Sequence, residues 1–238
     1  MHIAIVGAGR AGTSFTLALR RVGHHVELVH HGEVALLAPC ELVLLAVPDD
    51  AIEYVAGQLR AVDGQVVAHA AGSRGLDVLG RHARVGSLHP LVPLASGERG
   101  AKRLIGATYS VAGDDVIDHV VTTLRGRILR LRDDQRPAYH AAATVSANHL
   151  VALMGHVERL AQSAGLSLED FLPLARLALD DVDEFGPARA LTGPASRGDM
   201  ATIDAHLAVI PEAERSTYVA MANAAFELAE RSRTQLPA

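Results

Sequence analysis

Residues 2–12 read HIAIVGAGRAG, and this stretch decides the fold of the first half of the chain. The apolar run His2–Val6 is typical of a buried strand, and the residues after the glycines have the spacing of a helix. Gly7 allows a tight turn at the end of the strand, and Gly12 permits close packing of the helix on the strand. Gly9 lets a bound group approach the backbone closely, because it has no side chain. The stretch therefore predicts a strand, a glycine turn and a helix, in that order.

The same turn has the chemistry of a phosphate site. Backbone N–H groups at the start of a helix have no partner within the helix, and the helix dipole adds a partial positive charge there. Three glycines at this spacing are typical of dinucleotide binding, although glycine also marks ordinary structural turns. We expect the diphosphate of a dinucleotide to be held by Gly7, Ala8, Gly9, Arg10, Ala11 and Gly12.

The end of the second predicted strand indicates which dinucleotide is bound. NAD enzymes carry an Asp or Glu there, which holds the ribose hydroxyls. In the strand His25–Val29 the only carboxylate, Glu27, lies in mid-strand, and His30 and His31 follow the last strand residue. Together with Arg10 these histidines could contact a 2′-phosphate, so the pattern favours NADP over NAD. The alternative is that the two histidines are solvated turn residues.

The first half alternates short apolar runs with helical patterns, which is typical of a parallel sheet covered on both faces. We therefore predict an N-terminal α/β Rossmann domain over residues 1–131. The connection over residues 30–41 is too short for a full crossover helix. The predicted strands are His2–Val6, His25–Val29, Leu42–Ala46, Gln65–His69, Arg84–Leu88, Thr108–Val111 and Arg127–Leu131.

After Leu131 no β-branched run recurs, and alanine-rich and leucine-rich stretches take over with a period near 3.6. We predict an all-α domain over residues 132–238. Asp133 and Asp134 can cap a long helix that ends at Gly165. Further helices are expected at Ser167–Asp181, Gly198–Ala208 and Pro211–Ser232.

Composition excludes several classes of function. The chain has 238 residues, is 49% hydrophobic and carries a net charge of −5 without a basic stripe, so nucleic acid is not an expected partner. The longest apolar runs, such as Leu42–Val47, are too short to cross a membrane, and no signal peptide is recognisable. The single Cys40 fits a reducing compartment, so we expect a cytoplasmic protein. No HExxH motif or cysteine cluster suggests a metal site.

Ligands of open α/β sheets bind beyond the carboxyl ends of the parallel strands. The residues just past three predicted strands are therefore candidates for the site: Val47 and Pro48 after the third, Ser73 after the fourth and His89 at the fifth. For the first three we expect cofactor contact. Each of them could equally be ordinary loop chemistry.

Five stretches resemble bacterial Rossmann-like oxidoreductases whose C-terminal helical domain has no assigned function. They are GAGRAG at 7–12, VPDDAI at 47–52, SLHPL at 87–91, YHAAATVSANHLVAL at 139–153 and LTGPASRGD at 191–199. The family is similar to pyrroline-5-carboxylate reductases, prephenate dehydrogenases, 6-phosphogluconate dehydrogenases and ketopantoate reductases. The resemblance implies an N-terminal cofactor domain, NADP-linked reduction, and a C-terminal domain of the 6-phosphogluconate dehydrogenase type that closes the site and forms a homodimer.

The resemblance also implies site residues on the long helix. In related dehydrogenases a lysine there donates a proton and asparagines further along hold the substrate; counted back from Gly165, these positions fall on His140, Thr144 and Asn148. His140 replaces the lysine, and an imidazolium can donate a proton at neutral pH. The alternative is a buried histidine bonded to a backbone carbonyl. We expect Tyr139, which points about 100° away from His140, to be a packing or supporting residue.

Two further residues complete the predicted site. His89 in SLHPL resembles the His-Pro pair of prephenate dehydrogenases and is a second candidate for the acid, or else a turn residue before Pro90. Arg197 in LTGPASRGD could hold a substrate carboxylate, because its planar guanidinium matches that group, or could form an interdomain salt bridge. Asp199 is expected to cap the next helix or to pair with Arg197.

Together these features predict an NADP-dependent reductase of a small 2-keto acid or similar carbonyl compound, in the manner of the ketopantoate reductases. One alternative is a non-catalytic NADP(H) sensor or scaffold, because the expected lysine is missing and Lys102 is the only lysine in the chain. Another alternative is a dehydrogenase that acts on an imine or a prephenate-like substrate.

Overall fold

The computed structural model describes residues 1–235, apart from the side chains of His31, Ala35, Leu36, Ser232, Thr234 and Gln235. Contacts divide the chain into two compact units, Met1–Ala147 and Asn148–Ala238. The first unit contains one sheet, and a strand of it lies at every position where the sequence predicts one. Its strands are β1 His2–Val6, β2 His25–Val29, β3 Leu42–Leu45, β4 Val66–His69, β5 Arg84–Pro90, β6 Thr108–Gly113 and β7 Arg127–Arg130.

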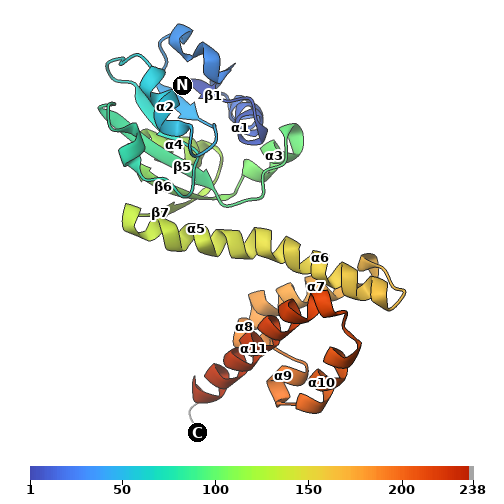
Figure 1. Ribbon diagram of the computed structural model, residues 1–238. Coiled ribbons are helices and arrows are strands. Elements are labelled where there is room, and N and C mark those ends of the chain that lie inside the picture. Colours follow the sequence, from blue (N-terminus) through green and yellow to red (C-terminus); the bar gives the residue numbers. More distant parts are fainter. Residues whose placement is uncertain (236–238) are drawn as a thin grey trace. The chain divides into compact units, whose positions relative to one another are not determined.

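The strands lie in the order β2-β1-β3-β4-β5-β6-β7. The prediction of a parallel sheet is confirmed for β1 to β5, whereas β6 runs antiparallel to β5 and parallel to β7. The reason lies in the connection, in which helix α3 (Gly97–Leu104) packs on helix α1 (Arg10–Arg21) instead of crossing the sheet (Figure 1). A Cβ at Gly100 would lie 2.0 Å from Ser14 Oγ, and Ser14 Oγ donates to the Ala95 carbonyl at 2.9 Å.

Two apolar cores cover the two faces of the sheet, because successive strand residues point to opposite sides. Ile3 and Ile5 of β1 join α1, α3 and α4 (Val116–Thr123), while Ala4 and Val6 join the other core. That second core includes α2 (Ile52–Gln58) and the short 3₁₀ helices η1 (His31–Leu36) and η2 (Leu76–Leu79). Helix η1 alone fills the link from β2 to β3, which confirms the prediction of a degenerate crossover.

The predicted long helix is present, with one interruption. It comprises η3 (Asp133–Gln135), α5 (Arg136–Thr144), the π-helical turn η4 (Val145–His149) and α6 (Leu150–Ser163). Gly165 follows with φ +73°, a conformation typical of the residue after a helix end. The two units divide within η4, at Ala147 and Asn148, whereas the sequence places the change of domain at residues 131 and 132.

The second unit is helical, as the sequence predicts. After α6 it contains α7 (Leu168–Phe185), α8 (Pro187–Ala190), α9 (Pro194–Arg197), α10 (Met200–Val209) and α11 (Glu212–Gln235). Glu214 of α11 joins it to α6 by accepting from His156 Nδ1 and from Arg159 Nε, each at 2.6 Å. These two partners lower the pKa of Glu214 to about 2. Asp199 caps α10 by accepting from the Thr202 amide at 3.1 Å, as predicted.

Candidate functional site at the carboxyl edge of the sheet

Two of the three glycines of the first turn are required by the fold itself. Gly7 has φ +111°, and a Cβ on it would lie 2.6 Å from the Ala46 carbonyl oxygen. A Cβ on Gly12 would lie 1.7 Å from the Gly7 carbonyl oxygen. Both distances are shorter than any real Cβ contact, so larger residues at 7 or 12 would force the turn apart.

Gly9 differs, because the fold does not require a glycine there. It is the residue before α1, with φ −74° and ψ −168°, and a Cβ on it would meet nothing within 4 Å. The first helical bond runs from the Thr13 amide to the Gly9 carbonyl at 3.0 Å, and no side chain caps the helix. The amides ahead of Thr13 are thus left unpaired by the helix, and the first turn carries no acidic residue. This open cradle fits the diphosphate of a dinucleotide.

The end of β2 lies beside the cradle, because the Gly7 amide donates to the Val29 carbonyl at 2.9 Å. Glu27 pairs with Ala4 in the middle of the ladder, as the sequence predicts, and does not reach the end of the strand. His30 follows Val29 and is exposed, as is Arg10 at the start of α1. The side chain of His31, the third residue predicted to meet a 2′-phosphate, lies outside the described residues.

Contacts then link the cradle to the loops after β3 and β4. A Cβ on Gly7 would lie 3.2 Å from Val47 Cγ1, so Val47 borders the cradle; Pro48 beside it is exposed. Ser73 Oγ, in the loop after β4, donates a short hydrogen bond to Asp49 in the loop after β3. The predicted residues Val47 and Ser73 therefore lie along one edge of the sheet.

The edge ends in a cluster of three polar side chains, His89, Tyr139 and His140. His89 Nδ1 and the Tyr139 hydroxyl are 2.8 Å apart, with ring planes at 89°. The His140 ring lies 6.3 Å from the His89 ring, measured between centroids. Gly72, after β4, holds the other side of His89, because a Cβ there would lie 2.9 Å from the imidazole. Two predicted residues, His89 and His140, are thus brought together, and Tyr139 joins them as a hydrogen-bond partner.

Burial sets the protonation of this cluster. It lowers the pKa of His89 from 6.5 to about 4, with a smaller contribution from the neighbouring His140 and an opposing one from Asp49. Burial raises the pKa of Tyr139, against the effects of the Ser110 hydroxyl and the Arg136 charge. At neutral pH His89 is therefore an uncharged imidazole and Tyr139 an uncharged phenol.

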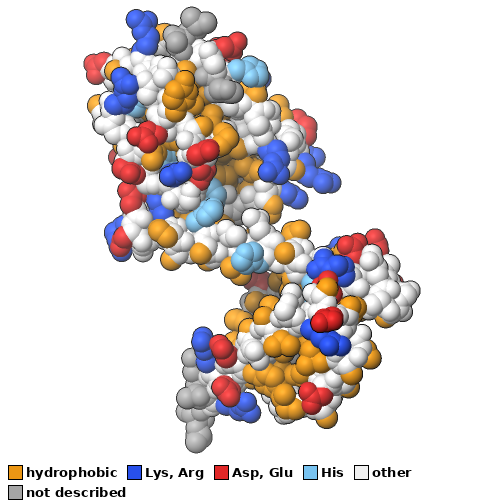
Figure 2. Space-filling model, in the orientation of Figure 1, with side chains coloured by type: hydrophobic (Ala, Val, Ile, Leu, Met, Phe, Trp, Pro, Cys, Tyr) orange, Lys and Arg blue, Asp and Glu red, His pale blue; other side chains and the backbone are white. Residues whose placement is uncertain are grey.

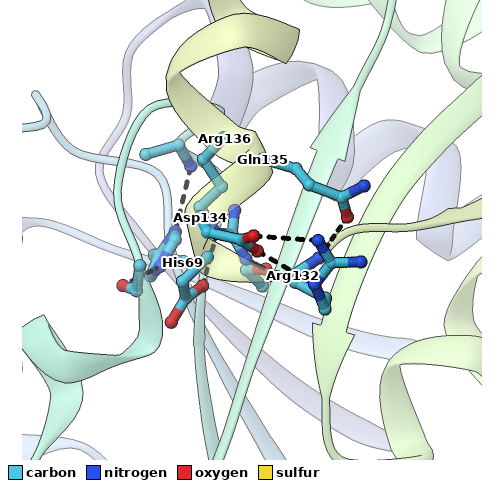
Figure 3. A network of polar contacts seen from close by, with 9 residues as sticks. His69, Arg132, Asp134, Gln135 and Arg136 are labelled. Atoms are coloured by element: carbon cyan, nitrogen blue, oxygen red, sulfur yellow. Dashed lines mark hydrogen bonds and ion pairs between the residues drawn. The ribbon is translucent and has the colours of Figure 1, made fainter.

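A buried arginine lies behind the cluster, and sequence reasoning missed it. Arg136, only 1% exposed, donates from Nη2 to Ser87 Oγ and from Nε to Asp133 Oδ1, both at 2.7 Å. Figure 3 shows this network at the start of α5, where Arg132 also bonds to Asp134 and Gln135. The signal was the spacing: Arg136 lies three residues before Tyr139 and four before His140, so each of these side chains is a neighbour of Arg136 on the helix surface.

His69 of β4 belongs to the same buried network, and its partners fix its tautomer. Nδ1 accepts from the Ala71 amide at 3.3 Å, so Nε2 carries the proton and donates to the Gly75 carbonyl at 3.1 Å. Burial lowers the pKa of His69. This side chain supports the loop after β4 and has no nitrogen left for a ligand.

The remaining predicted residues lie further along the chain. Thr144 is half-buried at the end of α5, in the first unit. Asn148 and Arg197 are exposed and belong to the second unit, Asn148 in the π-turn and Arg197 at the end of α9. The i, i+4, i+8 spacing from His140 assumes an uninterrupted α-helix, and η4 interrupts it before Asn148. The roles of Asn148 and Arg197 stay predictions.

In the described part of the chain, no three His, Cys, Asp or Glu side chains gather closely enough to hold a metal ion. None of the helices within residues 1–235 is both long and apolar enough to cross a membrane.

Two family models match different parts of the chain. The model of a family described as "Domain of unknown function (DUF2520)" matches residues 105–225, and the model of a Rossmann-like domain matches residues 27–95. No curated protein matches the sequence.

Solved structures share the fold over nearly its whole length. A Bacteroides fragilis protein named as a candidate NADP oxidoreductase is 22% identical, with a TM-score of 0.80, covering 95% of this chain and 98% of that one. Plasmodium falciparum pyrroline carboxylate reductase with NADP bound is 12% identical, with a TM-score of 0.63 and coverages of 98% and 97%. An Aspergillus terreus reductive aminase in complex with NADPH and ethyl levulinate is 18% identical, with a TM-score of 0.66 and coverages of 98% and 94%. At these identities the similarity establishes the fold.

Proposed function

Because this chain belongs to the DUF2520 family, whose function is undefined, the function must be inferred from its own site, and we propose an NADP-dependent reductase of a small carbonyl compound. One observation carries the proposal. Close approaches, hydrogen bonds and short chain segments along the carboxyl edge link the glycine cradle to a hydrogen-bonded histidine and tyrosine: Gly7 lies close to Val47, Asp49 bonds to Ser73, Gly72 lies close to His89, and His89 bonds to Tyr139.

The two ends of this edge would supply the hydride and the proton that reduction of a carbonyl group needs. NADPH, when bound at the cradle, supplies a hydride for the substrate carbon. Ser73, after β4, and His89, on β5, lie two and three strands from β1, or roughly 10 and 14 Å at the usual strand spacing. The cluster of His89, Tyr139 and His140 would provide the proton that the reduced oxygen needs.

Of the two nicotinamide dinucleotides we propose NADP. Glu27 stays in mid-strand, so no carboxylate at the end of β2 would repel a 2′-phosphate. Exposed Arg10 and His30 at this end of the sheet are groups that could meet that phosphate. The names of the three structural neighbours, each of which mentions NADP or NADPH, support the same choice.

For the substrate we propose a small 2-keto acid, reduced as in the ketopantoate reductases. In this proposal His140 belongs to the proton-donating cluster, Thr144 and Asn148 orient the substrate, and Arg197 holds its carboxylate. Two neighbours are named for reduction or reductive amination, and pyrroline carboxylate contains a C=N bond. A cyclic imine carboxylate is therefore the second candidate substrate, and it carries the same carboxylate.

We also propose that the chain forms a homodimer through the second unit. Helix α7 has no buried residue although it is rich in leucine, and Leu174 and Leu177 are 65% and 61% exposed. Figure 2 shows hydrophobic side chains gathered on this unit. Burying such side chains against a second copy would be favourable. Sedimentation of the purified chain at micromolar concentration checks this, and a monomer contradicts it.

The experiment that tests the function is a calorimetric titration of the full chain with NADPH and with NADH. We expect saturable binding of one NADPH per chain, tighter than NADH, and oxidation of NADPH in the presence of some member of a panel of 2-keto acids and cyclic imines. Tight NADPH binding with no oxidation across the panel would favour a sensor instead of an enzyme. Absence of binding by folded protein would overturn the proposal.

A matched pair of variants makes the binding test specific. Gly9→Ala adds a methyl group where the fold has room but a diphosphate would approach, whereas Gly155→Ala adds one in α6 of the second unit, at ordinary van der Waals distance from Arg159. We expect Gly9→Ala to weaken NADPH binding by about tenfold or more, since hydrogen bonds to a charged phosphate are worth about 1.5–3 kcal/mol each. Gly155→Ala should leave the affinity unchanged.

A further inference from the structure

Tyr139 and His89 form a hydrogen-bonded pair in this structure. The phenol comes from the first turns of α5 and the imidazole from the end of β5, and their polar atoms are 2.8 Å apart. We propose that Tyr139 is the catalytic residue that gives the proton to the reduced substrate oxygen, and that His89 resupplies Tyr139. This inference rests on the proposed reductase function and names the donor within its cluster.

The positions of both rings are fixed by their surroundings. The imidazole of His89 packs directly against Gly72, because a Cβ on that residue would lie 2.9 Å from the ring. The ring therefore cannot move towards Gly72. Arg136 holds the start of α5 on β5 through Ser87, and Ser87 and His89 lie two residues apart on the same face of the strand. Tyr139 follows Arg136 on the same helix face, so its hydroxyl is directed at His89.

His140 lacks such support. Among the described residues no hydrogen-bond partner orients its imidazole, which meets the cluster only through its 6.3 Å ring contact with His89. A general acid must be held within hydrogen-bond reach of the atom that it protonates. The better-oriented donor is therefore the neighbouring Tyr139, which sequence reasoning assigned to packing or support.

In this relay the substrate gains one hydride and one proton. Hydride adds to the carbonyl carbon, the C=O π electrons move to oxygen, and this oxygen takes the phenolic proton of Tyr139. The Tyr139 oxygen takes the Nδ1 proton of His89, and Nε2 of His89 takes a proton from water. Nε2 is suited to this step, because it has no protein partner among the described residues and is not buried from solvent. The imidazole is uncharged before and after this exchange, with its proton moved from Nδ1 to Nε2. Release of the Nε2 proton to water and uptake of one at Nδ1 restore the starting tautomer for the next turnover, so the net reaction consumes one hydride and one solvent proton.

The charges around the pair support an uncharged relay. His140 and Arg136 on α5, and His69 on β4, disfavour a positive charge on His89, and Asp49 after β3 opposes them. Burial keeps the pKa of His89 near 4 and raises that of Tyr139. The proton thus comes from a phenol, and the reduced oxygen, an alkoxide, is a stronger base than a phenolate.

The variant Tyr139→Phe removes only the hydroxyl. We expect kcat for reduction to fall about 100-fold or more, the usual scale of lost acid catalysis, with KM and the NADPH affinity little changed. The matched control is Tyr218→Phe in the second unit, whose hydroxyl lies 2.7 Å from His206 Nδ1 and which should retain full activity. The wild-type rate should stay level from pH 6 to pH 8, whereas an imidazolium donor would lose activity as the pH rises over this range.

A second variant and a spectroscopic measurement cover the relay itself. His89→Asn keeps an N–H group near Tyr139 but cannot pass a proton, so kcat should again fall while NADPH binds. In ¹⁵N-histidine spectra of the protein without nucleotide, His89 should be neutral at pH 7 with its proton on Nδ1. These signals should shift in Tyr139→Phe and not in Tyr218→Phe.

These outcomes separate the role of Tyr139 from the reductase function. Tyr139→Phe with turnover within about threefold of the wild type, or His89 unprotonated at Nδ1, would overturn the inference and leave the reductase function standing. A wild-type protein that binds no NADPH would overturn the function, and the spectra would then judge the tyrosine–histidine pair alone.

Discussion

The chain contains two tyrosine–histidine pairs with almost the same geometry, one in each unit. In the first pair His89 Nδ1 lies 2.8 Å from the Tyr139 hydroxyl, and the ring centroids are 5.7 Å apart with the planes at 89°. In the second pair His206 Nδ1 lies 2.7 Å from the Tyr218 hydroxyl, and the ring centroids are 5.8 Å apart with the planes at 86°. The first pair is half-buried at the carboxyl edge of a Rossmann sheet, whereas His206 is exposed on a helix surface.

The comparison shows that a tyrosine–histidine hydrogen bond by itself does not indicate a functional site. In the first pair burial lowers the pKa of His89 to about 4, a buried arginine lies behind the pair, and a series of contacts leads from it to an open glycine cradle. A catalytic role follows from these surroundings, because they control protonation and place a reactive group where a ligand can bind. The second pair ties α10 to α11.

The largest effect that separates the pairs is expected in acid stability. The pKa of His89 is about 4 in the folded protein and about 6.5 in the unfolded chain. The free energy of unfolding is therefore unaffected by this group above pH 6.5, and it decreases as the pH falls towards and through 4, because the unfolded chain binds the proton more tightly. At pH 4 the loss is about 3 kcal/mol. Urea unfolding of the wild type and His89→Asn at pH 7 and pH 4 measures it.

His89→Asn should lose correspondingly less stability between these two pH values, although it starts from a lower value. The same comparison with His206→Asn should follow the wild type. Equal pH dependence in the wild type and His89→Asn would mean that His89 titrates normally, and the contrast between the two pairs would disappear.

A smaller effect separates Tyr139 from its neighbour. If Tyr139 gives the proton, His140→Ala should lower kcat by less than about tenfold, well below the roughly 100-fold that loss of a general acid costs. It should also raise the pKa of His89, since His140 contributes to the lowering. Steady-state kinetics and ¹⁵N-histidine titration measure these two changes. A loss of about 100-fold would return the role of donor to His140, as the sequence resemblance predicts.

The sequence predicted the fold more completely than the site. The strands follow from apolar runs between turn residues, and the degenerate link at η1 follows from the length of residues 30–41. The direction of β6 could not be predicted, because periodicity carries no direction and the packing of Gly100 on Ser14 is a tertiary contact. The π-turn between α5 and α6 likewise left no recognisable pattern.

At the site, local motifs were recognisable and long-range pairings were not. The glycine cradle lies within six consecutive residues, 7–12, so its geometry could be predicted. The bond between His89 and Tyr139 spans 50 positions, and that between Ser87 and Arg136 spans 49. Helical spacing placed Tyr139 on a different face from His140, but the hydroxyl of Tyr139 reaches His89 while the His140 ring stays beside it.

If a nicotinamide dinucleotide in the glycine cradle extends to the His89–Tyr139 pair, its binding must change the surroundings of His89. The most direct measurement is a titration of the ¹⁵N-histidine-labelled full chain with NADPH, with His89 and His206 assigned by their asparagine variants. We predict that the His89 signals shift saturably in the wild type and need a higher NADPH concentration in Gly9→Ala, while those of His206 stay in place. Saturable binding that leaves His89 unmoved would contradict the claim.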